Sequence, residues 1–175
     1  MKNAAVAFAA ALCLAAGSAL AQALNDAQIA AITVAANQVD IDAGKVAKSK
    51  ATDKDVKAFA DRMVTDHTSV NKQATDLAKK LKMKPEENET STSLKAGGEE
   101  NLKKLKDLKG AAFDRAYIDH EVTYHQTVLD TIDKSLIPNA KNEELKALLT
   151  KTRPVIQEHL EHAKKIQAAL GKKTS

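Results

Sequence analysis

The chain has almost no cysteine and very few aromatic side chains. Its single cysteine is Cys13, tryptophan is absent, and Phe and Tyr together make up 3% of the 175 residues. Because Cys13 falls in an N-terminal segment that we expect to be removed, the mature protein has no thiol. Disulfide bonds and catalysis by a cysteine thiolate are therefore excluded.

A strong charge of one sign is also missing. The formal net charge is +4 with Lys2 included, and the lysines are interspersed with acidic residues but not with aromatic ones. Nucleic-acid binding needs a basic stripe or stacking side chains, so we expect no nucleic acid partner. The sequence also lacks a serine elbow, a phosphate-binding loop and a paired di-metal motif. We therefore favour a protein without enzymatic activity.

Residues 1–21 have the pattern of a signal peptide. The basic residue Lys2 precedes an apolar run from Ala4 to Ala16 that is too short to cross a membrane. Small residues then offer a cleavage site after Ala21 or, as an alternative, after Ala23. We expect an exported, soluble, periplasmic protein whose mature part, residues 22–175, forms one domain without a transmembrane segment.

Four long segments repeat apolar side chains every three or four residues, which is the pattern of amphipathic helices. They cover about residues 25–50, 52–84, 113–137 and 139–170. No segment alternates with period two, so a sheet or barrel is not expected. The sequence predicts an all-α protein, namely an antiparallel four-helix bundle of the ferritin-like type.

The longest connection is predicted between the second and third of these helices. Residues 86–98 are polar and contain the pair Gly97-Gly98, which is typical of a loop. Leu102, Leu105 and Leu108 then indicate a short extra helix before the third long helix, closed at Gly110. We expect it to cap one end of the bundle.

Three histidines interrupt the apolar stripes of three different helices. A rise of 1.5 Å per residue places His67 roughly 21 Å, His125 roughly 17 Å and His159 roughly 27–30 Å from the same end of the bundle. With helix boundaries uncertain by about 6 Å, the three rings share the middle third. On the first helix the same level falls at Asp40, and Glu121 lies one turn before His125.

This pattern leaves two interpretations open. Imidazoles with one or two carboxylates suit a single transition metal ion such as zinc, copper or iron, with His67, His125, His159, Asp40 and Glu121 as candidate ligands. No Glu-x-x-His pair is present, so a di-iron carboxylate centre is not expected. Alternatively, the rings form a core hydrogen-bond network in a non-catalytic structural or interaction module.

Four segments resemble an exported bacterial family known as domain of unknown function 4142, whose members are often labelled outer-membrane proteins. They are DIDAGKVA (Asp40–Ala47), FADRMVTDHTSVN (Phe59–Asn71), GAAFDRAYIDHEVTYHQ (Gly110–Gln126) and RPVIQEHLEHA (Arg153–Ala163).

The resemblance implies a ferritin-like helical bundle. It places the family's motif positions on His67, His125 and His159, with Asp40 where relatives usually carry Glu. Neither a lipobox nor a strand pattern supports an outer-membrane location. Metal handling or stress protection is the function that we expect, and the sequence indicates no protein partner.

Overall fold

The computed structural model describes residues 23–173, and all regular structure in that range is helical. The all-α prediction is therefore confirmed, whereas the predicted signal peptide, residues 1–21, lies outside the described residues. The elements in chain order are α1 (Asp26–Lys50), α2 (Lys54–Lys80), α3 (Glu89–Lys106), α4 (Gly110–Thr131), the π-helical turn η1 (Ile132–Leu136), α5 (Ile137–Asn139) and α6 (Glu143–Lys173).

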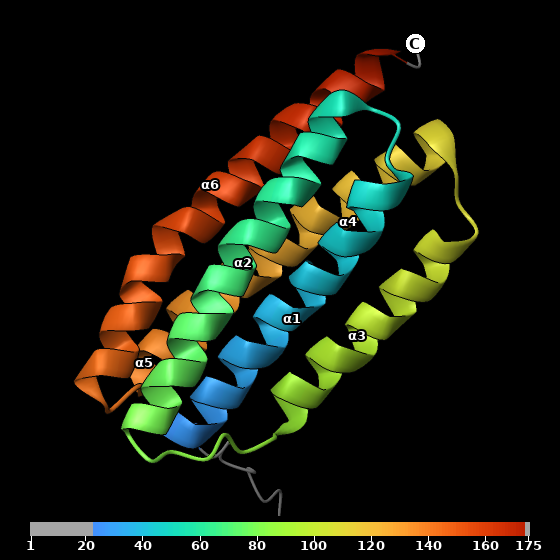
Figure 1. The fold of residues 1–175 in the computed structure, drawn as a ribbon. Coiled ribbons are helices and arrows are strands. Elements are labelled where there is room, and N and C mark those ends of the chain that lie inside the picture. The colour runs from blue at the N-terminus through green and yellow to red at the C-terminus, as the bar shows by residue number, and fades with distance from the viewer. Residues whose placement is uncertain (1–22, 174–175) are drawn as a thin grey trace, which may run out of the picture.

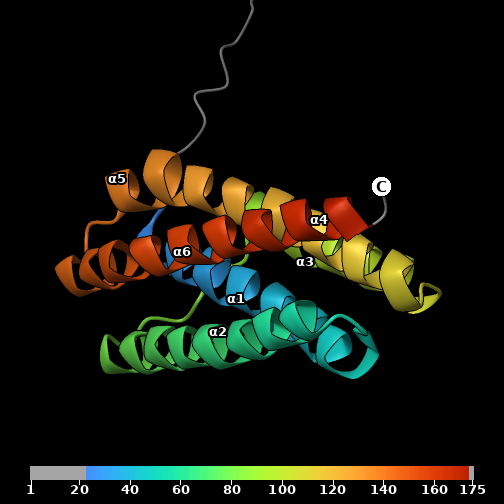
Figure 2. The ribbon, with the colours of Figure 1, turned by 90° about the horizontal axis from the view of Figure 1, so that it is seen from above.

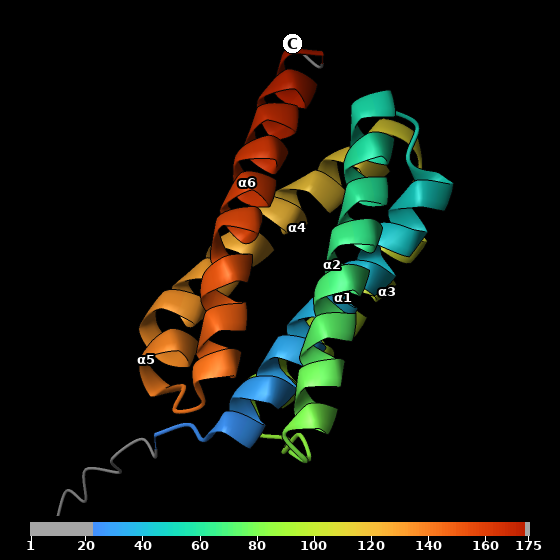
Figure 3. The ribbon, with the colours of Figure 1, turned by 60° about the vertical axis from the view of Figure 1, so that its left-hand side comes forward.

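The long helices lie side by side with alternating direction along the chain (Figure 1). The α1 helix packs against α2 on one side and α3 on the other, while α4 packs against α6. The α2 and α6 helices also touch, so the two pairs enclose a common interior (Figure 2). Figure 3 shows that α4 crosses obliquely between α6 and the α1–α2 pair. Within residues 23–173, no helix is both long and apolar enough to cross a membrane.

The hydrophobic core consists of two clusters near opposite ends of the helices. One includes Phe59, Phe113 and Tyr117 and lies toward the α1–α2 turn. The other includes Ile29 and Leu149 and lies toward the start of α6. On α1, α2, α4 and α6 the residues between the two clusters include Asp40 and the three predicted histidines, so a polar layer separates the two apolar ones.

The prediction for the segment before α4 was wrong. Residues 89–98 were expected to form a loop followed by a short helix at the end of the bundle, but α3 has 18 residues and runs along α1. Asn88 begins it, because its side chain accepts a hydrogen bond from Ser91 N at 3.1 Å. Gly98 lets the two helices approach, since a Cβ there would lie 2.8 Å from Val39 Cγ2. A glycine expected in a loop therefore marks a helix contact.

Several predicted helix ends are displaced. The side chains that begin α2 and α6 are Asp53 and Asn142, where the sequence predicted Thr52 and Asn139. Gly110, with φ +56°, begins α4 instead of closing the preceding helix. The sequence predicted helix ends at residues 137 and 170, but α5 extends through Pro138 to Asn139 and α6 extends to Lys173. The first helix starts where the sequence predicted, and a capping box formed by Asn25 and Gln28 begins it.

Asp114 fixes the start of α2 from a neighbouring helix, which the sequence did not predict. Its carboxylate is 2% exposed and accepts hydrogen bonds from Thr52 Oγ1 at 2.6 Å and from Asp53 N at 2.8 Å. It also accepts a bond from Thr52 N at 3.0 Å. The carboxylate therefore supplies acceptors for backbone N–H groups that precede α2.

Replacing Asp114 by alanine is expected to lower the free energy of unfolding by about 3 kcal/mol, because it leaves buried N–H groups without an acceptor. Urea unfolding followed by circular dichroism measures this loss. Asp119→Ala, at a half-buried position on the same helix, is the control and is expected to cost about 0.5 kcal/mol. Equal losses in both variants would show that Asp114 has no special role in beginning α2.

Candidate metal centre

The three predicted histidines meet in the interior. His67 comes from α2, His125 from α4 and His159 from α6, and each side chain is at most 3% exposed. The ring centroids are 5.7 Å apart for His67 and His125, 5.2 Å for His67 and His159, and 5.4 Å for His125 and His159. Asp40 of α1, 2% exposed, completes the group with one residue from each of four helices.

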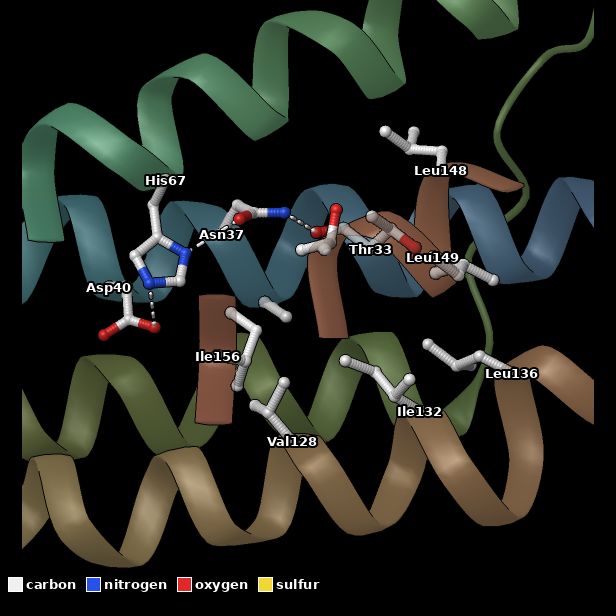
Figure 4. Close-up of a pocket in the computed structure, with 12 residues that line it drawn as sticks. Thr33, Asn37, Asp40, His67, Val128, Ile132, Leu136, Leu148, Leu149 and Ile156 are labelled. Carbon is white, nitrogen blue, oxygen red and sulfur yellow. Dashed lines mark hydrogen bonds and ion pairs between the residues drawn. The ribbon is translucent and has the colours of Figure 1, made fainter. Parts of the chain in front are cut away.

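One nitrogen of each ring is already engaged in a hydrogen bond. His67 Nδ1 lies 2.8 Å from Asn37 Oδ1 (Figure 4). The Asn37 amide donates through its nitrogen to the Thr33 carbonyl at 2.7 Å, so its oxygen faces His67 and accepts. His125 Nδ1 donates to the backbone carbonyl of Glu121 at 2.9 Å. These bonds place a proton on Nδ1 of both rings.

The third ring is oriented by a carboxylate. His159 Nε2 lies 2.9 Å from Asp66 Oδ2, and Arg62 Nε donates to the same oxygen at 3.2 Å. Burial alone would raise the pKa of Asp66, but the bonds from His159 and Arg62 outweigh it and hold that pKa below its ordinary value. Asp66 is therefore an anion that accepts the Nε2 proton, and the lone pair of His159 lies on Nδ1.

The remaining ring nitrogens face one another without a hydrogen-bond partner. They are His67 Nε2, His125 Nε2 and His159 Nδ1. Within the cluster, one ligand atom from each residue lies within 4.8 Å of the other two. An ion at the centre of an equilateral triangle with 4.8 Å sides would lie about 2.8 Å from each corner, so each ring needs to move by less than about 1 Å to reach a metal–nitrogen bond length.

Asp40 adds a fourth electron-pair donor to this group. Its Oδ2 lies 3.3 Å from His67 Nε2 and 3.9 Å from His125 Nε2, while its Oδ1 has no hydrogen-bond partner. Burial acts to raise the pKa of Asp40, but His67, His125, a hydrogen bond with Glu121 and His159 together outweigh it and lower that pKa. Because His67 and His125 use Nδ1 for their other hydrogen bonds, their Nε2 lone pairs face Asp40 Oδ2 with no ring proton between them.

Glu121 differs from Asp40 in its charge. It is fully buried, both carboxyl oxygens lack a hydrogen-bond partner, and Oε2 lies 3.4 Å from His125 Nδ1. Burial, followed by the negative charge of Asp40, raises the pKa of Glu121 well above its ordinary value. Its surroundings therefore favour the protonated form of Glu121. The Tyr117 hydroxyl, also buried and unpartnered, has its pKa raised by burial and then by the charge of Glu121.

Burial keeps the rings of His67 and His159 neutral. It lowers the pKa of His67, although Asp40 acts in the opposite direction. It also lowers the pKa of His159 from 6.5 to about 4, against the opposing hydrogen bond to Asp66. A neutral imidazole is the form that binds a metal ion, so these two rings keep their ligand form in mildly acidic solution.

In the metal-free protein, His159 is expected to make stability depend on pH. The unfolded ring takes up a proton near pH 6.5 and the native ring only near pH 4, so stability is lost as the pH falls through this window. The difference corresponds to about 3 kcal/mol. Urea unfolding at pH 7 and pH 4 should show that His159→Gln loses about 3 kcal/mol less than the native protein. Equal losses of stability in the two proteins would contradict the assignment to His159. The contributions of Glu121 and His67 are common to both proteins and cancel in the comparison.

The other residues considered from the sequence lie outside the cluster. His162 packs its ring edge against Phe59 with 5.4 Å between centroids. His120 is half-buried, and its ring stacks on that of Tyr124 with 5.6 Å between centroids. Glu158 forms a salt bridge with Arg62 at 3.0 Å. Asn37 was not predicted as part of the site, although the sequence placed the level of the histidines at residues 37–40 of the first helix.

Comparisons with other proteins agree with this fold. The crystal structure of a protein described as a secreted DUF305 protein from Streptomyces coelicolor has a TM-score of 0.71, with 12% sequence identity. The match covers 82% of this chain and 92% of that chain, which at this identity shows similarity of fold alone. No curated protein matches significantly. A model of the family described as domain of unknown function (DUF4142) matches residues 11–166, which is most of the chain, and the protein belongs to that family.

Proposed function

We propose that this protein binds one transition metal ion through His67, His125, His159 and Asp40. The observation that carries the proposal is the convergence of three histidine rings, each with one nitrogen that has no hydrogen-bond partner, beside the buried carboxylate of Asp40. Buried acceptors that face one another repel unless a cation lies between them. A metal ion at their centre satisfies all four donors at once.

The donor set limits the choice of ion. Three imidazole nitrogens with one carboxylate oxygen suit zinc, copper or iron, and the absence of thiol and thioether ligands disfavours ions that prefer sulfur. Asn37, the Glu121 carbonyl and Asp66 each hold one ring nitrogen, which is how the surroundings of a metal site fix the rings. Glu121 lies close enough to orient His125 or to offer a further ligand after losing its proton.

The cellular role that fits this site is metal handling or protection against stress in the periplasm. The signal-peptide pattern of residues 1–21 supports export, and the mature chain from residue 22 onward would be a single domain. We further propose that α1, α2, α4 and α6 form an antiparallel four-helix bundle of the ferritin-like type, with α3 as an added helix on its surface. The residues of the site, one from each of those four helices, support this description.

The metal content of the protein tests the proposal. Protein purified without chelator, and metal-free protein titrated with zinc, copper(II) or iron(II), are expected to hold one ion per chain by mass spectrometry and calorimetry. Protein that stays metal-free after exposure to all three ions would overturn the proposal. It would favour the second candidate, a structural or interaction module in which a proton is shared between Asp40 and His67, 3.3 Å apart.

A further inference from the structure

A narrow cavity leads from the molecular surface to the cluster. It lies between α1, the α4–η1 segment and α6, and its volume is about 30 Å³ (Figure 4). His67, Asp40 and Asn37 bound it on one side, where the polar layer begins. The rest of the lining is mostly aliphatic and includes Ile132, Leu136, Leu148, Leu149 and Ile156.

The outer part of this cavity is open to solvent and the inner part is not. Ala36, Val128 and Leu148 are half-buried and form the rim, whereas Leu149 and Ile156 are no more than 3% exposed. The cavity is therefore a short channel with an apolar wall and His67 at its inner end. Of the candidate metal ligands, only Asp40 and His67 line the channel.

Away from Asp40 and His67, which belong to the proposed metal site, two polar side chains of the wall are engaged in hydrogen bonds. Thr33 Oγ1 donates to the Ile29 carbonyl at 2.8 Å, and Asn37 donates to Thr33 while accepting from His67. A water molecule in a buried cavity needs two to four polar partners, and an ion needs more. The wall therefore favours an uncharged guest with little need for hydrogen bonds.

Irregular backbone lies on two sides of the channel. Ile132 and Leu136 belong to the π-helical turn η1, and Thr152 and Ile156 flank Pro154, which interrupts the hydrogen bonding of α6. Regular helices at these two places would give a different spacing of side chains along the channel. The cavity thus lies beside two departures from regular α-helix, the π-helical turn η1 and the helix around Pro154.

Resting on the proposed metal site, we infer that this channel admits a small uncharged molecule of two or three heavy atoms to the metal ion. The volume of about 30 Å³ holds a diatomic or triatomic molecule and excludes an acyl chain or a sugar. Such a molecule would approach the ion from the side of Asp40 and His67, which line the channel. The protein would then bind a dissolved gas or a molecule of similar size at its metal ion.

Two measurements test this inference. Crystals of the metal-free protein under xenon pressure are expected to show xenon in the channel, because xenon occupies dry apolar cavities. Iron(II)-loaded protein mixed with nitric oxide should form an iron–nitrosyl absorption band, and its rate reports passage to the metal. Ala36→Leu places a larger side chain at the rim and is expected to slow that rate about tenfold, a barrier increase of about 1.4 kcal/mol.

The control and a second variant keep the outcome clear. Ala58→Leu puts the same side chain on the exposed face of α2 and should leave the nitric oxide rate unchanged. If Ala36→Leu does not fold, Leu149→Phe narrows the buried part of the same channel. Bound iron with no xenon in the channel and equal rates in all variants would overturn the inference. Protein that binds none of zinc, copper and iron would instead overturn the proposed function, and xenon would still decide whether the channel takes an uncharged guest.

Discussion

The protein in which His125 is replaced by leucine is expected to bind the metal ion at least about a hundredfold more weakly than the native protein. A structural zinc ion bound by four ligands contributes about 10–16 kcal/mol, so one ligand contributes about 3 kcal/mol or more. The His125 ring lies near every other candidate ligand, since its centroid is within 5.7 Å of both other histidines and its Nε2 lies 3.9 Å from Asp40 Oδ2. Competition with a chromophoric chelator measures the change in affinity.

The same substitution separates the two candidate functions. Leucine has a similar volume, and the hydrogen bond that His125 loses runs to a backbone carbonyl of its own helix, so the metal-free variant should keep its stability within about 1 kcal/mol. His162→Leu is the matched control, because this ring lies on α6 outside the cluster and against Phe59. Equal metal affinity in the native protein and His125→Leu would rule out the histidine site.

Metal removal is expected to produce the second large effect. An ion that binds only the native state stabilises it by about 4 kcal/mol when its free concentration is a thousand times the dissociation constant. The effect is reinforced because the ion also satisfies the facing lone pairs of His67 and Asp40, which otherwise lie 3.3 Å apart. Thermal unfolding with and without a strong chelator measures the difference at a fixed protein concentration.

The variant His125→Leu is again the informative control for this experiment. Its melting temperature should be nearly unaffected by metal or chelator, since the ion no longer distinguishes the folded from the unfolded chain. A native protein whose unfolding is indifferent to chelator, measured after confirmed metal loading, would show that the ion binds at the surface and not in the interior.

The position of the site could be predicted because it follows from regular helices. The apolar periodicity sets the axial and rotational positions of His67, His125 and His159, and a constant rise per residue places them at one level. The same argument selected Asp40 over other acidic residues of the first helix. All four side chains are at most 3% exposed and lie together, as the periodicity required.

The remaining features depend on contacts between helices that periodicity does not describe. The ring nitrogen that each histidine leaves free is set by Asn37, the Glu121 carbonyl and Asp66, and these come from three different helices. The helix α3 was missed because glycine and polar residues are read as a loop, whereas Gly98 serves a close contact with Val39. The buried carboxylate of Asp114 was missed for the same reason, since its partners precede another helix.

The absence of cysteine from residues 22–175 gives the arrangement of the four ligands a further meaning. Asp40 and His159 stand 119 positions apart in the sequence, so an ion held by both closes a very large loop. A covalent bridge across about 100 residues removes roughly 5 kcal/mol of unfolded-chain entropy in the chain-entropy model. The ion would therefore act as a cross-link between the first and last helices of a domain without thiols. Unlike a disulfide bond, this cross-link is not broken by thiol reductants. A chelator, or a partner that takes the ion, would release it.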